Sequence, residues 1–266
     1  MIKFLYSNNK LIGEIKYTPE IFRNYKKHSH CMLCLGIIEK GSLSIEFSSQ
    51  EKKLQPHQIA IFNPFQPHKI NNFNAKGYYT IYINLDWALD VQKKIYPHLI
   101  NFSFSNKNII ENKEITQICE NIVMEKKVDK NTYFLLKIIK NILTPHINST
   151  QNFHSNISPL TQKIKKYIEF NNTLSLSIEE IAKYLHYNKS YLIRVFKKDM
   201  GITPQQYILN YKVNMAKQHL LTDTEESLIE LSYKYGFYDQ SHFNRNFKRI
   251  FATTPKSYKK SILYNN

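Results

Sequence analysis

The sequence has little of what identifies several common protein classes. Three cysteines in 266 residues are too few for a disulfide framework and indicate a reducing environment. No apolar run approaches the roughly 18 residues that a membrane-spanning helix needs, and the first residues lack the apolar core of a secretion signal. We therefore expect a cytoplasmic protein with no membrane partner.

Acidic residues are also scarce. The 21 acidic and 37 basic residues give a formal net charge of +16, which is compatible with a polyanionic partner. The excess divides equally, +8 on each side of residue 157, and the abundance of Lys, Asn, Ile, Tyr and Phe is what an AT-rich genome would produce. Charge alone therefore permits nucleic-acid binding but does not identify it. The length suits two domains.

A segment near the C-terminus has the pattern of a helix-turn-helix. Ser227 and Glu230 have the spacing of a capping box, which predicts a helix that starts at Ser227. Gly236 marks a tight turn, and Phe243 and Phe247 then recur at helical spacing. We expect the second helix to enter the major groove of double-stranded DNA.

The same pattern occurs about 51 residues upstream. Corresponding residues at this separation are Phe196 and Phe247, Lys197 and Lys248, Thr203-Pro204 and Thr254-Pro255, and Tyr207 and Tyr258. Ser177 and Glu180 repeat the capping box. A helix from about Thr203 to Leu221 joins the two units, and its length of about 27 Å is close to one DNA turn of about 34 Å. We therefore expect one chain to read two successive major grooves.

These segments resemble the C-terminal signature of the AraC/XylS family of bacterial transcription regulators, and the resemblance covers residues 158–260. It implies that an all-α domain with two helix-turn-helix motifs binds promoter DNA and acts with RNA polymerase. Two positions depart from the family pattern. Ser232 stands where alanine is common, and Ala252 stands where glycine usually precedes the Thr-Pro turn.

The resemblance also implies which residues read bases. They are Ser190, Ile193 and Arg194 in the first unit, and Gln240, Ser241, His242 and Arg245 in the second. Arginine pairs with guanine and glutamine with adenine through two hydrogen bonds, so Arg194, Gln240 and Arg245 are the strongest candidates. The residues expected to hold phosphates are Lys189, Lys197, Lys248 and Arg249.

The N-terminal part reads as short strands separated by turn residues, from about Glu14 to Leu85. This pattern predicts a small β-barrel or jelly roll, followed by helices at about 106–127 and 130–144. Residues 147–157 are polar and read as a linker. The predicted fold is thus α+β and multidomain, with domains at 1–146 and 158–266.

This arrangement resembles the cupin-type sensor domain that many members of the same family carry. In that family the barrel holds a small effector and the trailing helices pair two subunits, so the resemblance implies an effector and a homodimer. The candidate pocket residues are His28, His30, Cys34, His68 and Tyr82. Metal-binding cupins have a glutamate where Cys34 stands, and on an extended strand residues 28, 30 and 34 would share one face.

Imidazole and thiolate groups suit zinc, copper or iron. Regulator cupins keep this skeleton with organic effectors or with nothing bound, however, so we expect no metal cofactor. Together these features predict a transcription regulator, an activator rather than an enzyme, that a small molecule controls. The alternatives are a metal-binding cupin or metalloenzyme that uses His28, His30, Cys34 and His68, and a DNA-binding protein without an effector.

Overall fold

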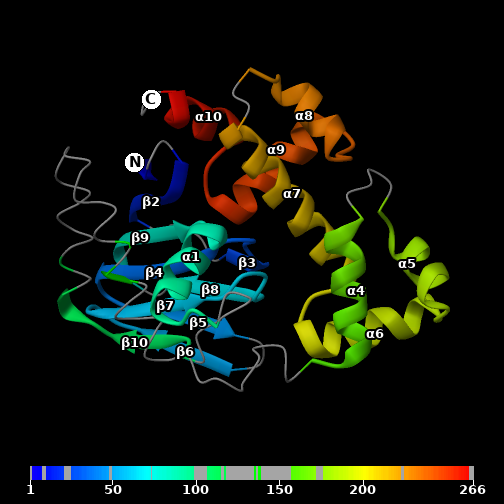
Figure 1. The fold of residues 1–266 in the computed structure, drawn as a ribbon, viewed down its shortest axis with the longest axis horizontal. Helices are drawn as coiled ribbons and strands as arrows, with labels where there is room; N and C mark the ends of the chain where they lie inside the picture. The colour runs from blue at the N-terminus through cyan, green and yellow to red at the C-terminus, as the bar shows by residue number, and fades with distance from the viewer. Residues whose placement is uncertain are drawn as a thin grey trace. The chain divides into compact units, whose positions relative to one another are not determined.

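The computed structural model describes residues 2–7, 10–20, 25–47, 50–72, 74–98, 107–114, 117, 135, 137–138, 157–171, 176–222 and 225–263. The chain divides into two compact units (Figure 1). The first consists of Met1–Asn24, Met32–Phe65 and Ile70–Ser155. The second consists of Tyr25–Cys31, Gln66–Lys69 and Asn156–Asn266.

The first unit is built on antiparallel strands. A six-stranded sheet has the order β1-β2-β9-β4-β7-β10, and every neighbouring pair in it is antiparallel. Its strands are β1 (Ile2–Ser7), β2 (Lys10–Glu20), β9 (Lys76–Ile83), β4 (Leu33–Lys40), β7 (Gln58–Phe62) and β10 (Ile109–Glu111). A four-stranded sheet has the order β3-β8-β5-β6. Its strands are β3 (Tyr25–His28), β8 (His68–Asn72), β5 (Leu43–Phe47) and β6 (Gln50–Leu54). Strand β3 and the first two residues of β8 are counted with the second unit.

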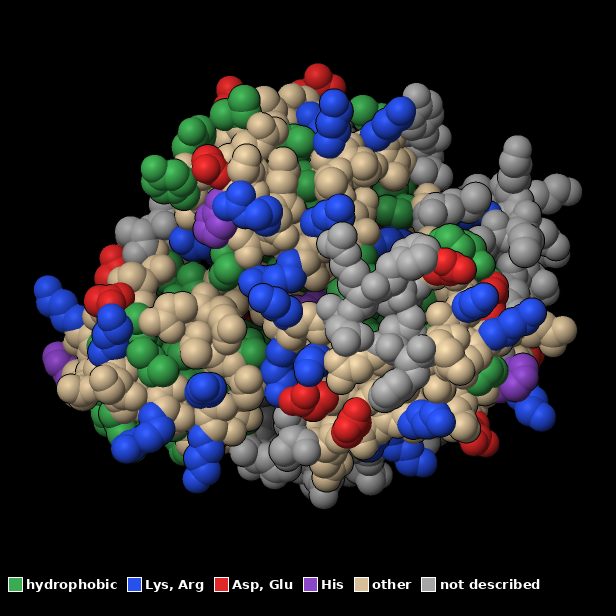
Figure 2. All heavy atoms as spheres, turned by 180° about the vertical axis from the view of Figure 1, so that it is seen from behind, with side chains coloured by type: hydrophobic (Ala, Val, Ile, Leu, Met, Phe, Trp, Pro, Cys, Tyr) green, Lys and Arg blue, Asp and Glu red, His purple; other side chains and the backbone are tan. Residues whose placement is uncertain are grey.

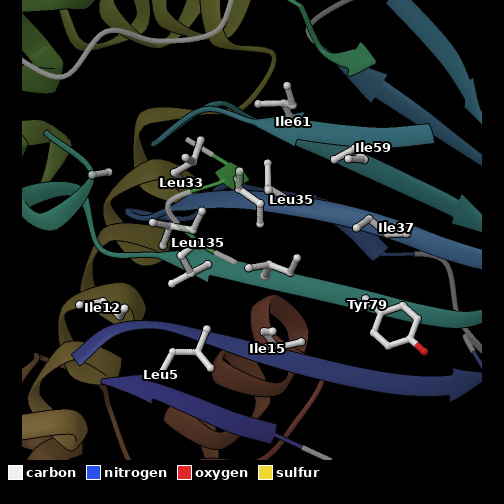
Figure 3. Close-up of a cluster of buried hydrophobic side chains, with 14 of the residues drawn as sticks. Leu5, Ile12, Ile15, Leu33, Leu35, Ile37, Ile59, Ile61, Tyr79 and Leu135 are labelled. Atoms are coloured by element: carbon white, nitrogen blue, oxygen red, sulfur yellow. The ribbon is translucent and has the colours of Figure 1, made fainter. Parts of the chain in front are cut away.

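One face of the six-stranded sheet is closed by apolar packing (Figure 3). Alternate residues of each strand point to this face, as Leu33, Leu35 and Ile37 do on β4. Helix α1 (Leu85–Ile95) adds Ala88 and Val91 to the same cluster. The intervening residues of the strands therefore point to the opposite face of the sheet.

The segment after α1 differs from the prediction. The predicted helix at 106–127 is wrong at its start, because Ile109–Glu111 forms β10 and pairs with β7. In the predicted helix at 130–144, the described residues Leu135, Lys137 and Ile138 are helical, and the two apolar ones are fully buried in the sheet's core. In the predicted helix at 106–127, residues 113, 114 and 117 are helical. Phe134, Ile142, most of the remaining residues of both segments and all of the predicted linker except Ile157 lie outside the described residues.

The second unit contains the helices predicted for the C-terminal part and a further one, at Pro255–Leu263, that was not predicted. They are α4 (Pro159–Phe170), α5 (Ile178–Leu185), α6 (Lys189–Met200), α7 (Pro204–Thr222), α8 (Leu228–Lys234), α9 (Gln240–Phe251) and α10 (Pro255–Leu263). Both predicted capping boxes are present: Ser177 and Glu180 begin α5, and Ser227 and Glu230 begin α8. Each box satisfies backbone N–H groups that would otherwise lack a partner at the helix start.

Helix α7 joins the two helix-turn-helix units and contacts helices of both. Within the second compact unit, α7 packs against α4 and α6 on the side of the first helix-turn-helix and against α9 and α10 on the side of the second. Its Lys217 is 2% exposed, and the ammonium lies 4.6 Å from the ring centre of Phe251 and 5.2 Å from that of Tyr258. Such cation–π contacts compensate part of the cost of burying the charge.

Candidate nucleic-acid interface

The first recognition helix is α6. The side chain of Asn188 accepts a hydrogen bond from the Ser190 backbone N–H at 2.8 Å, which fixes the start of the helix. Leu192 and Phe196 are buried against the rest of the unit. The opposite side leaves Ser190 and Arg194 exposed and Ile193 half-buried, so the three predicted base-reading residues lie on the accessible part of this helix.

An aromatic stack precedes and supports Arg194. The rings of Tyr187 and Tyr191 are stacked with centroids 5.8 Å apart, and the guanidinium carbon of Arg194 lies 5.5 Å from the Tyr191 ring centre. Both tyrosines are exposed, at 45% and 40%. Sequence reasoning missed this feature, because Tyr187 lies before the helix cap Asn188 and its contact with Tyr191 depends on the turn that precedes α6.

The second recognition helix, α9, is capped and packed in a similar way. Asp239 accepts a hydrogen bond from the His242 backbone N–H at 2.5 Å. Phe243 and Phe247 are fully buried. The four predicted base-reading residues of this helix differ in exposure: Ser241 and Arg245 are exposed, whereas Gln240 and His242 are half-buried.

His242 differs from its neighbours in environment. Its ring packs edge-on against Phe237 with centroids 5.6 Å apart. Its Nδ1 atom is buried without a hydrogen-bond partner among the described residues. These contacts place His242 partly in the turn between α8 and α9, whereas Arg245 projects from the exposed side.

The residues predicted to contact phosphates also differ in exposure. Lys197 and Lys248 are exposed, and exposed Lys189 forms an ion pair with Glu179. Arg249 is half-buried, and burial lowers the pKa of its guanidinium. It is therefore less accessible to a phosphate than the three lysines. On the face drawn in Figure 2, lysine and arginine side chains clearly outnumber acidic ones.

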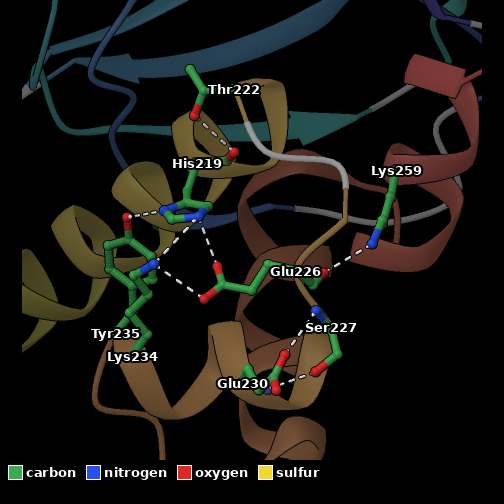
Figure 4. Close-up of polar contacts among 8 residues, drawn as sticks. All are labelled: His219, Thr222, Glu226, Ser227, Glu230, Lys234, Tyr235 and Lys259. Atoms are coloured by element: carbon green, nitrogen blue, oxygen red, sulfur yellow. Dashed lines mark hydrogen bonds and ion pairs between the residues drawn. The ribbon is translucent and has the colours of Figure 1, made fainter.

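A polar network holds the second helix-turn-helix against α7 (Figure 4). Glu226 Oε2 lies 2.7 Å from His219 Nε2 of α7, and the Glu226 carboxylate forms an ion pair with Lys234 of α8 at 3.1 Å. The Glu226 carbonyl accepts a hydrogen bond from Lys259 of α10 at 2.9 Å. His219 also contacts the hydroxyl of Tyr235 at 3.2 Å. Three helices are thus tied to the segment that precedes α8.

The predicted pocket residues fall into two groups. One ring nitrogen of each of His28, His30 and His68 lies within 4.8 Å of the others, and all three side chains are buried. Cys34 is not part of this group. The prediction that residues 28, 30 and 34 share a strand face is wrong, because β3 ends at His28 and β4 begins only at Leu33.

Hydrogen bonds to the backbone orient two of the three imidazoles. His28 Nδ1 lies 2.8 Å from the Lys26 carbonyl, and His68 Nδ1 lies 3.0 Å from the Gln66 carbonyl. A carbonyl only accepts, so each Nδ1 carries the proton. Burial lowers the pKa of His28 to about 4 and that of His68 well below its ordinary value. Both rings are therefore neutral at pH 7, with the lone pair on Nε2.

The other group lies on the six-stranded sheet. Glu14, Tyr82, Cys34 and Phe62 are directly opposite one another across β2, β9, β4 and β7. All four are buried, and they point away from the apolar cluster of Figure 3. A row with a carboxyl, a phenol and a thiol on this face can offer hydrogen bonds to a small molecule. Sequence analysis missed Glu14, because its place depends on strand register.

Two family models match the chain. A model described as an AraC-like ligand binding domain matches residues 20–126, and one described as a helix-turn-helix domain matches residues 181–261. The chain belongs to the AraC family of transcription regulators. The family assignment and the two-part fold made from the sequence are confirmed, including the effector-binding class of the N-terminal part.

Relatives and solved structures agree with this assignment. The uncharacterized HTH-type transcriptional regulator YbfI of Bacillus subtilis is 26% identical over 84% of this chain and 82% of its own length. The probable transcriptional regulator LumQ of Photobacterium leiognathi is 24% identical over 89% and 92%. Both relatives are described as transcriptional regulators.

Among solved structures, an apo variant of ToxT from Vibrio cholerae covers 94% of this chain and 97% of its own, with a TM-score of 0.59 at 14% identity. At this identity the likeness shows the fold alone. In the described part of the chain, no helix combines the length and the apolar character needed to cross a bilayer.

Proposed function

We propose that this AraC-family protein binds a two-part promoter site through α6 and α9, and that a small molecule bound by the N-terminal unit controls its activity as a transcription activator. The observation that carries the DNA-binding half is the repeated arrangement of α6 and α9. Each helix has a side-chain cap at its start, a buried aromatic face and an exposed arginine, Arg194 or Arg245.

The spacing of the two recognition helices supports a bipartite site. Helix α7 has 19 residues, a length of about 28 Å, and it contacts helices of both helix-turn-helix units. A rigid spacer of this length places two readers about one DNA turn apart, so one chain contacts successive major grooves. Sites of the wrong spacing would have to bend the DNA.

Selection of bound DNA from a random library tests this function. The expected result is a consensus of two half-sites whose centres are 10–10.5 base pairs apart. Arg194→Ala should relax a position in one half-site and Arg245→Ala a position in the other. Lys260→Ala, a charge-matched control on the exposed side of α10, should leave the consensus unchanged. Recovery of random DNA by the unaltered protein would overturn the proposal.

The effector is proposed to lie against the buried row that contains Glu14, Cys34 and Tyr82. Support comes from the match of residues 20–126 to a ligand-binding domain and from the polar groups that the row presents. Solved structures of ToxT are described as bound to an unsaturated fatty acid and to a butenoic acid derivative, so small organic molecules are a reasonable first screen. A thermal shift that Tyr82→Ala abolishes would support this site.

The proposal includes a homodimer that acts with RNA polymerase on cytoplasmic DNA. The trailing helix that was expected to pair two subunits is less available for this, because its Leu135 and Ile138 pack into the core of the six-stranded sheet. The support for a dimer is therefore the prevalence of symmetric pairs among soluble proteins. Sedimentation of the full chain at micromolar concentration tests it, and a monomer at that concentration would contradict it.

A further inference from the structure

The three buried histidines have the chemistry of a metal site. The ring centroids of His28 and His68 are 4.5 Å apart, and those of His28 and His30 are 4.9 Å apart. The imidazoles of His28 and His68 are neutral, so each presents a lone pair on Nε2. Imidazole nitrogens are good ligands for zinc, copper, nickel and iron.

The hydrogen bonds around the triad match those of metal-binding histidines. A histidine ligand usually donates its other ring N–H to a carboxylate or a backbone carbonyl, which fixes the ring and the tautomer. His28 and His68 both do this with the carbonyl two residues before them. Each therefore presents Nε2 as a lone-pair donor without further rearrangement of the backbone.

The distances require a small adjustment. Three atoms that lie within 4.8 Å of one another are at most about 2.8 Å from the centre of an equilateral triangle, whereas a Zn–N bond is about 2.0–2.1 Å. Each donor atom would therefore move inward by at most about 0.7 Å. Three protein ligands leave a fourth position for water or an anion, as in open zinc sites.

We propose that His28, His30 and His68 bind one divalent transition-metal ion, with Zn²⁺ as the reference ion, and that its binding alters the DNA affinity of the second unit. The coupling part rests on the proposed function, whereas the metal site does not. The second unit itself contains all three ligands and the helices α6, α7 and α9.

The contacts around His30 carry the coupling. Its ring centroid lies 5.5 Å from that of Phe251, the last residue of recognition helix α9. Asn214 of α7 accepts a hydrogen bond from the Cys31 backbone N–H at 3.0 Å and donates one to the Ser29 carbonyl at 3.1 Å. Both neighbours of His30 are thus bound to α7. An inward movement of His30 changes its packing against α7 and α9 together.

The test is a titration of the full chain with Zn²⁺ after treatment with a chelator. We expect one ion per chain, and His30→Gln and His68→Gln should each weaken binding by about 100-fold or more, since even loss of an outer hydrogen bond to a ligand costs about 10–100-fold. His186→Asn is the matched control, because His186 is exposed and has a left-handed backbone that asparagine tolerates. Binding equal to wild type in the triad variants would overturn the site.

Two further measurements test the metal site and its coupling to DNA binding even if a triad variant folds poorly. Co²⁺ added to the unaltered chain should give the strong visible absorption of a four-coordinate ion, and the weak absorption of a six-coordinate ion would contradict the site. The affinity for a selected DNA should change between Zn²⁺ and chelator for the wild type but not for His68→Gln. An unchanged wild-type affinity would refute the coupling, whereas absence of any specific DNA binding would refute the proposed function and leave the metal titration intact.

Discussion

Ala252 ends recognition helix α9 in a conformation that favours glycine. Its backbone is left-handed, with φ 52° and ψ 25°. The residue 51 positions earlier, Gly201, ends α6 with φ 67° and ψ 6°. The two helix-turn-helix units therefore use the same left-handed cap, and the second unit builds it from a residue with a Cβ atom. We predict that Ala252→Gly stabilises the protein.

The magnitude follows from two opposing contributions to the free energy of unfolding. A left-handed backbone costs a residue with a Cβ about 1–2 kcal/mol, and glycine removes this strain. Glycine in turn loses more conformational entropy on folding than alanine, by about 0.5–1 kcal/mol. The net stabilisation is about 0.5–1 kcal/mol, which corresponds to an increase of roughly 2–5 °C in the melting temperature of a unit this size.

The reverse change at Gly201 is the matched control. Gly201→Ala introduces the same strain, and the new Cβ would lie 2.6 Å from the Lys27 ammonium, whose flexible side chain has to move. We expect a loss of about 1 kcal/mol. Thermal unfolding of the full chain by calorimetry measures both variants. A stability unchanged by either substitution, or shifted in the same direction by both, would refute the left-handed cap as the common end of the two helices.

Four further predictions concern the DNA-binding unit. Arg245→Ala should weaken binding to the selected DNA by about 1–3 kcal/mol and relax one base position; an equal loss on random DNA would reduce its role to a phosphate contact. Lys248→Ala should weaken binding to all sequences and reduce the salt slope by about 1, and an altered consensus would contradict this. Tyr191→Leu should remove a cation–π contact worth about 0.5–1 kcal/mol and lower base discrimination by Arg194, which binding to singly substituted DNA measures; unchanged discrimination would count against the stack. Burial alone would raise the pKa of Asp199, but hydrogen bonds to its carboxylate lower the pKa below the ordinary value of 3.8. The ionised carboxylate therefore stabilises the fold above about pH 4, and this contribution to the free energy of unfolding is lost as the pH falls below that value. Acid unfolding of Asp199→Asn should therefore depend less on pH, and the same acid dependence as wild type would disprove this.

The helical unit could be predicted well because its signals are local. The capping boxes at Ser177 and Ser227 need residues three apart, and the 51-residue repeat then relates α6 to α9. Helix α1 was missed although Asn84 caps it and Asp86 lies in its first turn. These signals are of the same local kind, so this helix was within reach of the sequence.

The barrel and its candidate sites depend on contacts between distant residues. Residues 109–111 were read as helix because their apolar character fits both states, and pairing with β7 decides for a strand. The break between β3 and β4 separates Cys34 from the histidine triad, and no periodic pattern shows such a break. Glu14 joins Tyr82 and Cys34 through the register of three strands, which the sequence does not contain in readable form.

The affinity of the protein for a selected site in which five base pairs are inserted between the half-sites tests the central claim most directly. Five base pairs rotate one half-site by about half a turn, to the opposite face of the duplex. If α7 holds α6 and α9 at a fixed spacing, the site with five inserted base pairs should bind nearly as weakly as random DNA. Ten inserted base pairs should return both half-sites to the same face of the duplex, but the half-sites would then lie too far apart for one chain to contact both. Equal affinity for the original and the five-base-pair insertion would contradict a single chain that reads two adjacent grooves.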